Sequence, residues 1–241
     1  MKAIILAAGR GTRLDGAAVK PKCLVEVGGV TLLRRQIDSL KNAGLKDIVI
    51  VIGFGGESIR DECGNDDIAF VENVRFAETS SLYSLSLARE HLTDGFVVLN
   101  CDVLFHPQML SSLLESSYEN ALLLSDTDTN PMGDEEMKVK TLEGRVVDIS
   151  KVLDPREADG ENVGIVKFGA EGATALVGYM DQLIANGGSK DWAPRAFREF
   201  AQHHPLHALS TRGLPWIEID FPEDYQRAVN EIYPQIEFNE S

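Results

Sequence analysis

The first fourteen residues limit the fold of this chain more than any other segment. A continuous apolar run at 3–8 passes directly into the glycine-containing segment "GRGTRL". Such a run, ended by glycine, is typical of a strand buried on both faces of a parallel sheet. Glycine has no side chain to keep phosphate oxygens away from backbone N–H groups. This stretch alone leaves two interpretations open, an ordinary turn after a strand and a phosphate-binding loop.

Apolar runs alternate with helical patterns as far as about residue 125. The predicted strands lie at 2–8, 47–53, 68–73, 96–100 and 121–125. Apolar residues at helical spacing predict helices between them, at 31–44, from Ser80 or Ser81 to 92, and at 106–117. Alternation of this kind is typical of βαβ units. It predicts an α/β, Rossmann-like fold with a mostly parallel sheet flanked by helices.

The pattern changes after residue 125. Residues 137–152 alternate and contain a Glu-Gly turn, which predicts a β-hairpin. A strand at 162–169, helices at about 170–186 and 191–203, a strand at 216–220 and a helix at 222–233 are expected to follow. We therefore predict a single domain over 1–241, with a nucleotide-binding half at 1–125 and an elaborated, acceptor-binding half at 126–241.

Composition removes several classes of function. The formal net charge of −15 argues against nucleic acid or an anionic membrane as a partner. No apolar run approaches the ~20 residues of a membrane span, and the first run is too short for a signal peptide, so a cytoplasmic protein is expected. The three cysteines form no CxxC pair, and neither zinc nor a disulfide framework is predicted. The oligomeric state stays open, with a homodimer among the options.

The glycine turn departs from two common nucleotide motifs. The dinucleotide fingerprint requires a third glycine where this chain has Leu14, and an acidic residue where the second strand ends in Gly53. A nicotinamide-dependent oxidoreductase is therefore disfavoured. Three cations, Arg10, Arg13 and Lys22, surround the turn, and this favours phosphate binding.

The compound motif "LAAGRGTRL…KPKCLVEVGG" resembles the signature of nucleotidyltransferases that join a nucleoside triphosphate to a phosphorylated small molecule. The segments "AETSSLYSLSLAREHL", "LNCDVLFHP" and "PWIEIDFPEDYQRA" are similar to those of the bacterial choline-phosphate cytidylyltransferases. The resemblance implies Mg²⁺-dependent transfer of a cytidylyl group from CTP to phosphocholine or a related aminoalkyl phosphate or phosphonate, with release of pyrophosphate. The alternative within this class is a sugar- or polyol-phosphate nucleotidyltransferase.

The remaining hypothesis is that the chain is a nucleotide-binding relative of these enzymes that has lost catalytic activity. Such a relative is expected to lack the lysine or the carboxylates, and this chain has Lys22, Asp102 and Asp220.

The resemblance also implies roles for residues of the first half. Lys22 would neutralise charge at the α-phosphate, and Arg13 with the loop amides would hold the β- and γ-phosphates. The predicted catalytic residues are therefore Lys22 and Arg13. The predicted nucleotide-binding residues are Leu6, Ala7, Ala8, Gly9, Arg10, Gly11, Thr12, Arg13, Lys22, Ser80, Ser81 and Asn100.

Two aspartates follow predicted strands that lie far apart in sequence. Asp102 follows the strand at 96–100, and Asp220 ends the strand at 216–220. Ligands of open α/β sheets bind at the carboxyl ends of strands, and Mg²⁺ takes one or two carboxylates plus phosphate oxygens. Both residues are therefore predicted to hold Mg²⁺, as the matching family positions do. Capping of the following helix is the alternative role for each.

The acceptor leaves a weaker signal. A quaternary ammonium group binds aromatic faces with a carboxylate nearby. The predicted acceptor-binding residues are Tyr83, Glu136, Asp191, Trp192, Trp216 and Glu218. A primary amine would satisfy the same set of residues, so an aminoethyl phosphate or phosphonate stays open.

Overall fold

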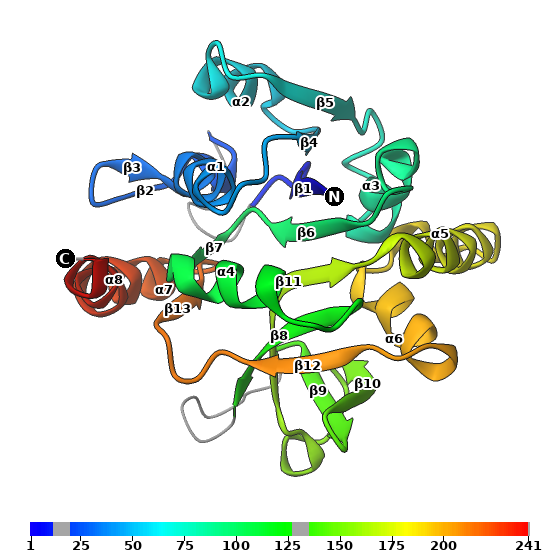
Figure 1. Ribbon diagram of the computed structural model, residues 1–241. Coiled ribbons are helices and arrows are strands. Elements are labelled where there is room, and N and C mark those ends of the chain that lie inside the picture. The colour runs from blue at the N-terminus through cyan, green and yellow to red at the C-terminus, as the bar shows by residue number, and fades with distance from the viewer. Residues whose placement is uncertain (12–19, 127–134, 241) are drawn as a thin grey trace.

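A nine-stranded sheet forms the centre of the computed structural model, which describes residues 1–11, 20–126 and 135–240 (Figure 1). In order across the sheet, the strands are β5 (Ile68–Glu72), β4 (Ile48–Ile52), β1 (Lys2–Ala7), β6 (Phe96–Asn100), β11 (Gly160–Phe168), β8 (Ala121–Asp126), β12 (His207–Ser210), β10 (Arg145–Ser150) and β9 (Lys138–Leu142). This arrangement confirms the predicted α/β fold class.

Helices cover both faces of this sheet. One face carries α1 (Leu32–Asn42), α2 (Gly56–Cys63) and α4 (Pro107–Glu115), and the other carries α3 (Ser81–Leu87), α5 (Ala170–Ala185) and α6 (Pro194–His203) (Figure 1). The chain then runs through α7 (Pro222–Arg227), a π-helical segment (Ala228–Ile232) and α8 (Tyr233–Glu240). No helix among residues 1–11, 20–126 and 135–240 has the length and apolar character needed to cross a membrane.

The first four strands of the sheet, β5-β4-β1-β6, are all parallel. Successive side chains of a strand point to opposite faces, and β1 shows this directly. Ile4 and Leu6 pack into the cluster beneath α3, α5 and α6, while Ile5 belongs to the cluster beneath α1 and α4. Burial on both faces explains why β1 is continuously apolar.

The second half of the sheet is mixed because β11 is inserted between β6 and β8, antiparallel to both. The predicted hairpin is present as β9 and β10. The strand β12 was not predicted; it pairs in parallel with β8. The sequence therefore predicted the parallel half more completely than the mixed half.

A separate two-stranded ladder joins β7 (Val103–Phe105) to β13 (Trp216–Glu218). Its antiparallel register places Trp216 opposite Phe105 and Glu218 opposite Val103. The small hairpin of β2 (Glu26–Val27) and β3 (Val30–Thr31) lies before α1. The β7–β13 ladder brings the end of β6 next to residues 218–220.

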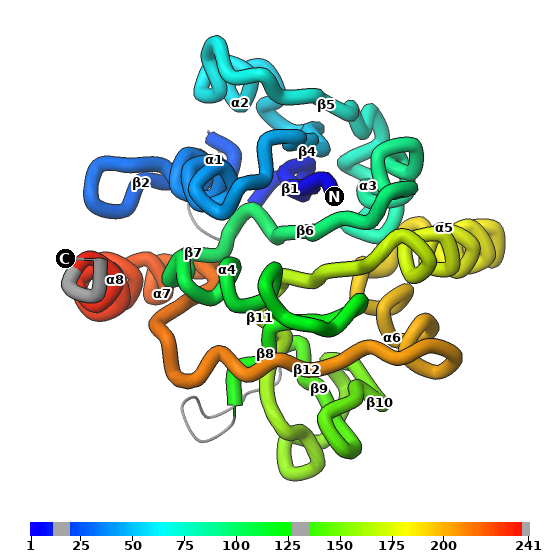
Figure 2. The backbone as a smooth tube through the Cα atoms, viewed as in Figure 1, coloured from blue at the N-terminus to red at the C-terminus, as the bar shows by residue number. Residues whose placement is uncertain are grey.

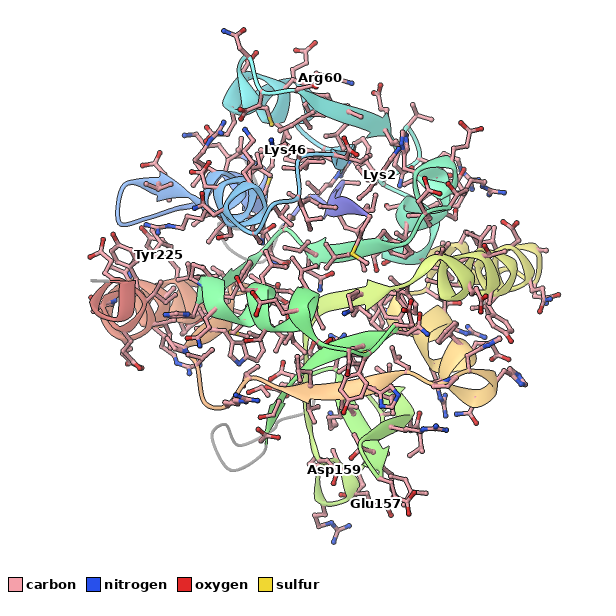
Figure 3. All side chains as sticks on the ribbon, in the orientation of Figure 1. Lys2, Lys46, Arg60, Glu157, Asp159 and Tyr225 are labelled. Carbon is pink, nitrogen blue, oxygen red and sulfur yellow. The ribbon has the colours of Figure 1, made fainter. Side chains whose placement is uncertain are left out.

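The N-terminus lies near the middle of the molecule, and the end of α8 lies at its edge (Figure 2). Figure 3 shows the labelled charged side chains of Arg60, Glu157 and Asp159 at the periphery. The residues inside the sheet are mostly apolar, whereas these charged side chains lie at the surface. Ionisable side chains inside the molecule are therefore candidates for a functional site.

Candidate active site

A cavity of about 350 Å³ opens along the carboxyl ends of the parallel strands. The lining residues from the half at 1–125, grouped below as one end of the cavity, are Leu6, Ala8, Gly9, Gly11, Asn73, Phe76, Thr79, Ser80, Ser81, Ser84 and Asn100. A group around the lysine consists of Lys22, Cys101, Asp102, Glu218 and Asp220, and the remaining lining residues, grouped as the other end, are Glu135, Met137, Lys151, Asn162, Trp192 and Pro194. The site therefore takes residues from both halves of the chain, at the edge where such sheets bind ligands.

Three carboxylates meet in the middle of the cavity. Asp102 follows β6, and the β7–β13 register places Glu218 and Asp220 beside it. The Ile219 N–H donates to the Asp102 carbonyl oxygen at 3.0 Å, which fixes the two segments together. One carboxylate oxygen from each side chain lies within 4.8 Å of the others. This is an all-oxygen donor set of the kind that a hard divalent cation prefers.

The ammonium of Lys22 lies among these carboxylates. Its Nζ donates to Asp220 Oδ1 in a short contact and lies 3.5 Å from Asp102 Oδ2. Burial alone would lower the pKa of Lys22, but the charges of Asp102 and Asp220 outweigh it, so the pKa is raised. Lys22 therefore stays charged at the centre of the cavity.

Burial and like charge act together on two of the carboxylates. Burial raises the pKa of Asp102, with Lys22 opposing the shift and Asp220 adding to it. Burial raises the pKa of Glu218 well above its ordinary value, and the charges of Asp102 and Asp220 raise it further. Three carboxylates this close repel one another, and a bound cation would relieve the repulsion.

The glycine turn is coupled to Lys22 by close packing. Gly11 has a φ of +61°, which side chains other than glycine rarely adopt. A Cβ at Gly11 would lie 2.3 Å from Lys22 Cγ. Because Pro21 and the short 3₁₀ helix Lys22–Leu24 direct the lysine back under the turn, the loop and its cation form one unit.

Most residues predicted to bind the nucleotide line one end of this cavity. Ala7 is buried within β1, and the guanidinium of Arg10 lies 5.5 Å from the ring centroid of Phe76, so neither lines it. Thr12 and Arg13 lie outside the described residues. Ser81 accepts a hydrogen bond from the Ala193 N–H at 2.8 Å, which ties α3 to the segment that carries Trp192.

Asn73 is a residue of this end that the sequence reasoning missed. It is 1% exposed, and its Nδ2 donates to Thr79 Oγ1 and Ser84 Oγ, each at 3.0 Å. This network holds the hydroxyls of Thr79 and Ser84 at the cavity wall. The sequence did contain an indication of this role, because Asn73 directly follows the strand β5 and so lies at the same sheet edge as Asp102.

Two of the predicted acceptor-binding residues, Trp192 and Glu218, line the cavity. Glu136 and Asp191 lie beside residues that do, but are not themselves part of the described wall. Asp191 pairs with Arg195 at 2.6 Å instead. Lys151, Met137 and Asn162 line this end and were not predicted, because the packing of β9 and β11 that gathers them leaves no local motif.

Two aromatic residues predicted to bind the acceptor, Trp216 and Tyr83, are not among the residues that line the cavity. Trp216 is 8% exposed and packs in the core opposite Phe105, because it precedes the carboxyl end of β13 by two residues. Tyr83 lies on α3 with the guanidinium of Arg75 over its ring at 5.2 Å. Neither belongs to the cavity wall as described.

Comparison with known proteins gives a family match along most of the chain. The sequence model of the family described as "MobA-like NTP transferase domain" matches residues 3–218.

Curated relatives match over nearly the whole chain. The choline-phosphate cytidylyltransferase of Streptococcus pneumoniae is 29% identical over 232 residues, covering 94% of this chain and 96% of that protein. The CMP-5'-(3-aminopropyl)phosphonate synthase of Streptomyces rubellomurinus is 28% identical, covering 95% of this chain and 38% of that protein. The solved structure of the CTP:phosphocholine cytidylyltransferase from Streptococcus pneumoniae superimposes with a TM-score of 0.81 at 26% identity, covering 94% of this chain and 96% of that one.

Proposed function

The chain belongs to the family of MobA-like NTP transferase domains, and we propose that it transfers a cytidylyl group from CTP to phosphocholine or a related aminoalkyl phosphate or phosphonate. Its predicted membership of the nucleotidyltransferases, and its nature as an enzyme of that class, are confirmed by the family match and by the cytidylyltransferases it resembles. One observation carries the proposal: a single cavity joins a glycine turn, a buried lysine and three carboxylates.

The donor set of the cavity fits Mg²⁺. Asp102 and Asp220 would hold the ion, with Glu218 as a third carboxylate within 4.8 Å. Bound there, Mg²⁺ would screen the negative charge of the phosphates. Because the protein carries a formal net charge of −15, local cations of this kind are what allow a triphosphate to approach.

Lys22 is the residue that we assign to the α-phosphate. A phosphate monoester or phosphonate is already anionic, so its oxygen attacks the α-phosphorus without a general base. The bond between the α-phosphorus and the bridging oxygen breaks, and pyrophosphate leaves with the electron pair. Transfer of this kind depends on alignment and on charge stabilisation, and a buried ammonium supplies the latter.

The two ends of the cavity support a division of labour between the halves of the chain. The backbone N–H groups at Gly9 and Gly11 would hold the β- and γ-phosphates, together with Arg13. The wall that contains Asn73, Thr79 and Ser84 would take the base and its ribose. The end at Trp192 and Lys151 would take the acceptor, so that its phosphate reaches the carboxylates.

A sugar- or polyol-phosphate acceptor is the alternative. The acidic and aromatic character of the acceptor end, with Glu135 and Trp192, favours an amine over a neutral polyol.

Pyrophosphate release tests the proposal. The protein is incubated with Mg²⁺, each of the four nucleoside triphosphates, and phosphocholine, phosphoethanolamine, aminoethyl phosphonate, a sugar phosphate or a polyol phosphate. We expect release with CTP and an aminoalkyl acceptor. Release only with UTP or dTTP plus a sugar phosphate would establish the alternative, and no release with CTP under any acceptor would refute both acceptor classes for CTP.

A further inference from the structure

A lysine already occupies the aromatic face at the acceptor end. The Nζ of Lys151 lies 4.7 Å from the ring centroid of Trp192, within the range of a cation–π contact. The same Nζ lies 3.5 Å from Glu135 Oε2. The aromatic ring and carboxylate that a trimethylammonium group requires are therefore both in contact with a cation of the protein itself.

Packing between β10 and α6 holds this arrangement in place. Lys151 directly follows β10, and Trp192 precedes α6 by two residues. Arg198 of α6 lies 2.7 Å from Asp148 of β10, and Gln202 Nε2 donates to the Val147 carbonyl at 2.8 Å. These contacts hold the backbone that carries Lys151 close to the segment that carries Trp192.

Asn162 lines the same end of the cavity and adds hydrogen-bond donors. Its Oδ1 accepts from the Gly164 N–H at 3.1 Å, so the amide oxygen is already engaged. The Nδ2 group has two N–H donors. With the ammonium of Lys151, this end of the cavity offers donors that match an anionic or hydrogen-bond-accepting oxygen group.

The possible acceptors differ in what they need from such a wall. A trimethylammonium group has no N–H to donate and depends on an open aromatic face, so it must displace Lys151 or sit against a like charge. A primary amine can donate directly to a carboxylate such as Glu218 or Glu135. An acceptor that also carries a carboxylate gains the ammonium of Lys151 as its partner.

Resting on the proposed cytidylyl transfer, we propose that Lys151 is a specificity-determining residue that selects acceptors with an anionic oxygen group at the end remote from the phosphate, and that it disfavours a trimethylammonium group there. The preferred substrate class is thus an aminoalkyl phosphate that also bears a carboxylate. Trp192 provides the surface on which the lysine is held.

The test compares three phosphomonoesters that differ only in their far end, namely phosphocholine, phosphoethanolamine and O-phosphoserine. The ratio of kcat/KM for O-phosphoserine to that for phosphocholine is measured with CTP for wild type, Lys151→Met and Lys151→Arg. Met keeps the apolar stem and removes the charge, while Arg keeps the charge and the aromatic contact. Lys140→Met is the matched control, because Lys140 lies on the same hairpin, 3.0 Å from Glu157 and away from the cavity wall.

We expect wild type to prefer O-phosphoserine by ~10-fold or more, the size of effect that one charge contact at a partly buried site produces. Lys151→Met should reverse the preference through the KM of the two acceptors, with the KM of CTP unchanged. Lys151→Arg and Lys140→Met should keep the wild-type preference. A wild-type preference for phosphocholine, or the same ratio in wild type and Lys151→Met, would overturn the proposal.

Binding measurements separate this inference from the proposed function. Each acceptor is titrated calorimetrically into the protein with a non-hydrolysable CTP analogue and Mg²⁺ present. Lys151-dependent binding of O-phosphoserine, together with no pyrophosphate release from CTP under any acceptor, would refute the transfer reaction and leave the role of Lys151 in acceptor binding standing. Absence of binding by O-phosphoserine, or binding that Lys151→Met leaves intact, would overturn the role of Lys151 whatever the turnover.

Discussion

The two halves of the molecule build their parts of the cavity in different ways. In the half at 1–125, the wall comes from residues at the ends of parallel strands, as Gly9 follows β1, Asn73 follows β5 and Asp102 follows β6. In the half at 126–241, the wall comes from segments whose strands run in both directions, around β9, β10 and β11. Under the proposed function, the first arrangement would fix where the nucleotide lies, and the second would determine which acceptor is taken.

This comparison predicts two kinds of mutational effect. Changes in the first half, and in the carboxylates, should lower kcat or raise the KM of CTP, and should do so for every acceptor alike. Changes in the second half should alter the KM of the acceptor and leave the nucleotide almost untouched.

The largest effect is expected for Lys22→Ala. Loss of a preorganised, largely buried charge should lower kcat by ~10²-fold or more for all acceptors. Lys20→Ala, which removes an exposed lysine two residues away, is the control and should retain wild-type kcat. Steady-state pyrophosphate release checks both, and a near-normal kcat in Lys22→Ala would remove the lysine from its assigned role.

Asp102→Asn should weaken metal binding by ~10- to 100-fold, because an amide oxygen has no net charge. Titration with Mn²⁺, followed by electron paramagnetic resonance, measures this without substrate. Asp148→Asn, a carboxylate on β10 paired with Arg198, serves as the control. Equal Mn²⁺ affinity in Asp102→Asn and wild type would show that the carboxylate cluster is not the metal site.

Asn73→Ala should raise the KM of CTP by ~10-fold with little change in kcat. The change leaves the hydroxyls of Thr79 and Ser84 without the amide that holds them, at a cost of about 1–3 kcal/mol. Asn73→Asp keeps an acceptor for the Arg75 N–H and loses the donor, which separates the two functions of the side chain. If the KM of the acceptor rose instead, this end of the cavity would not be the nucleotide end.

Trp192→Ala should raise the KM of the acceptor by ~3- to 10-fold and leave the KM of CTP unchanged, since the ring supports only the acceptor end. Trp192→Phe keeps an aromatic face and should restore much of the loss. A change in the KM of CTP alone would break the division between the two halves.

The last prediction concerns stability and not catalysis. Burial raises the pKa of Glu161 on β11 to about 7, the charge of Glu136 adds to the shift, and Lys138 and Lys151 oppose it. The folded protein therefore holds a proton that the unfolded chain releases near pH 4.5, so the free energy of unfolding falls as pH rises from about 5 to 8. Glu161→Gln should remove about 1–3 kcal/mol of this decrease.

Urea denaturation at several pH values measures the effect of Glu161→Gln. An unchanged slope of the free energy of unfolding against pH in the variant would contradict the assignment.

The sequence predicted the parts of the site that local patterns encode. An apolar run ending in glycine, and an aspartate two residues after a predicted strand, placed Gly9, Gly11 and Asp102 at one sheet edge. Asp220 and Glu218 were found in the same way, although the structure gathers Glu218 with the other two carboxylates rather than with the acceptor residues alone.

The parts of the fold and of the site that the sequence did not predict depend on pairing between strands that lie far apart in the chain. The strand order β11-β8-β12-β10-β9 follows no sequence signal, since β12 is only four residues long and half-buried throughout. The register that sets Glu161 opposite Lys138 gathers residues without a shared motif. For this reason Lys151 and Asn162 escaped prediction, and Trp216 was expected at a surface that it does not reach.

The ladder between β7 and β13 bears on the order of events during folding. It joins residues more than a hundred positions apart, and closing so long a loop costs entropy before any contact repays it. A chain in which the ladder has not formed holds Asp102 without Glu218 and Asp220. We therefore expect the carboxylate cluster to form late in folding, after the parallel strands have assembled. Protection of the Ile219 amide from hydrogen exchange would report when the ladder forms.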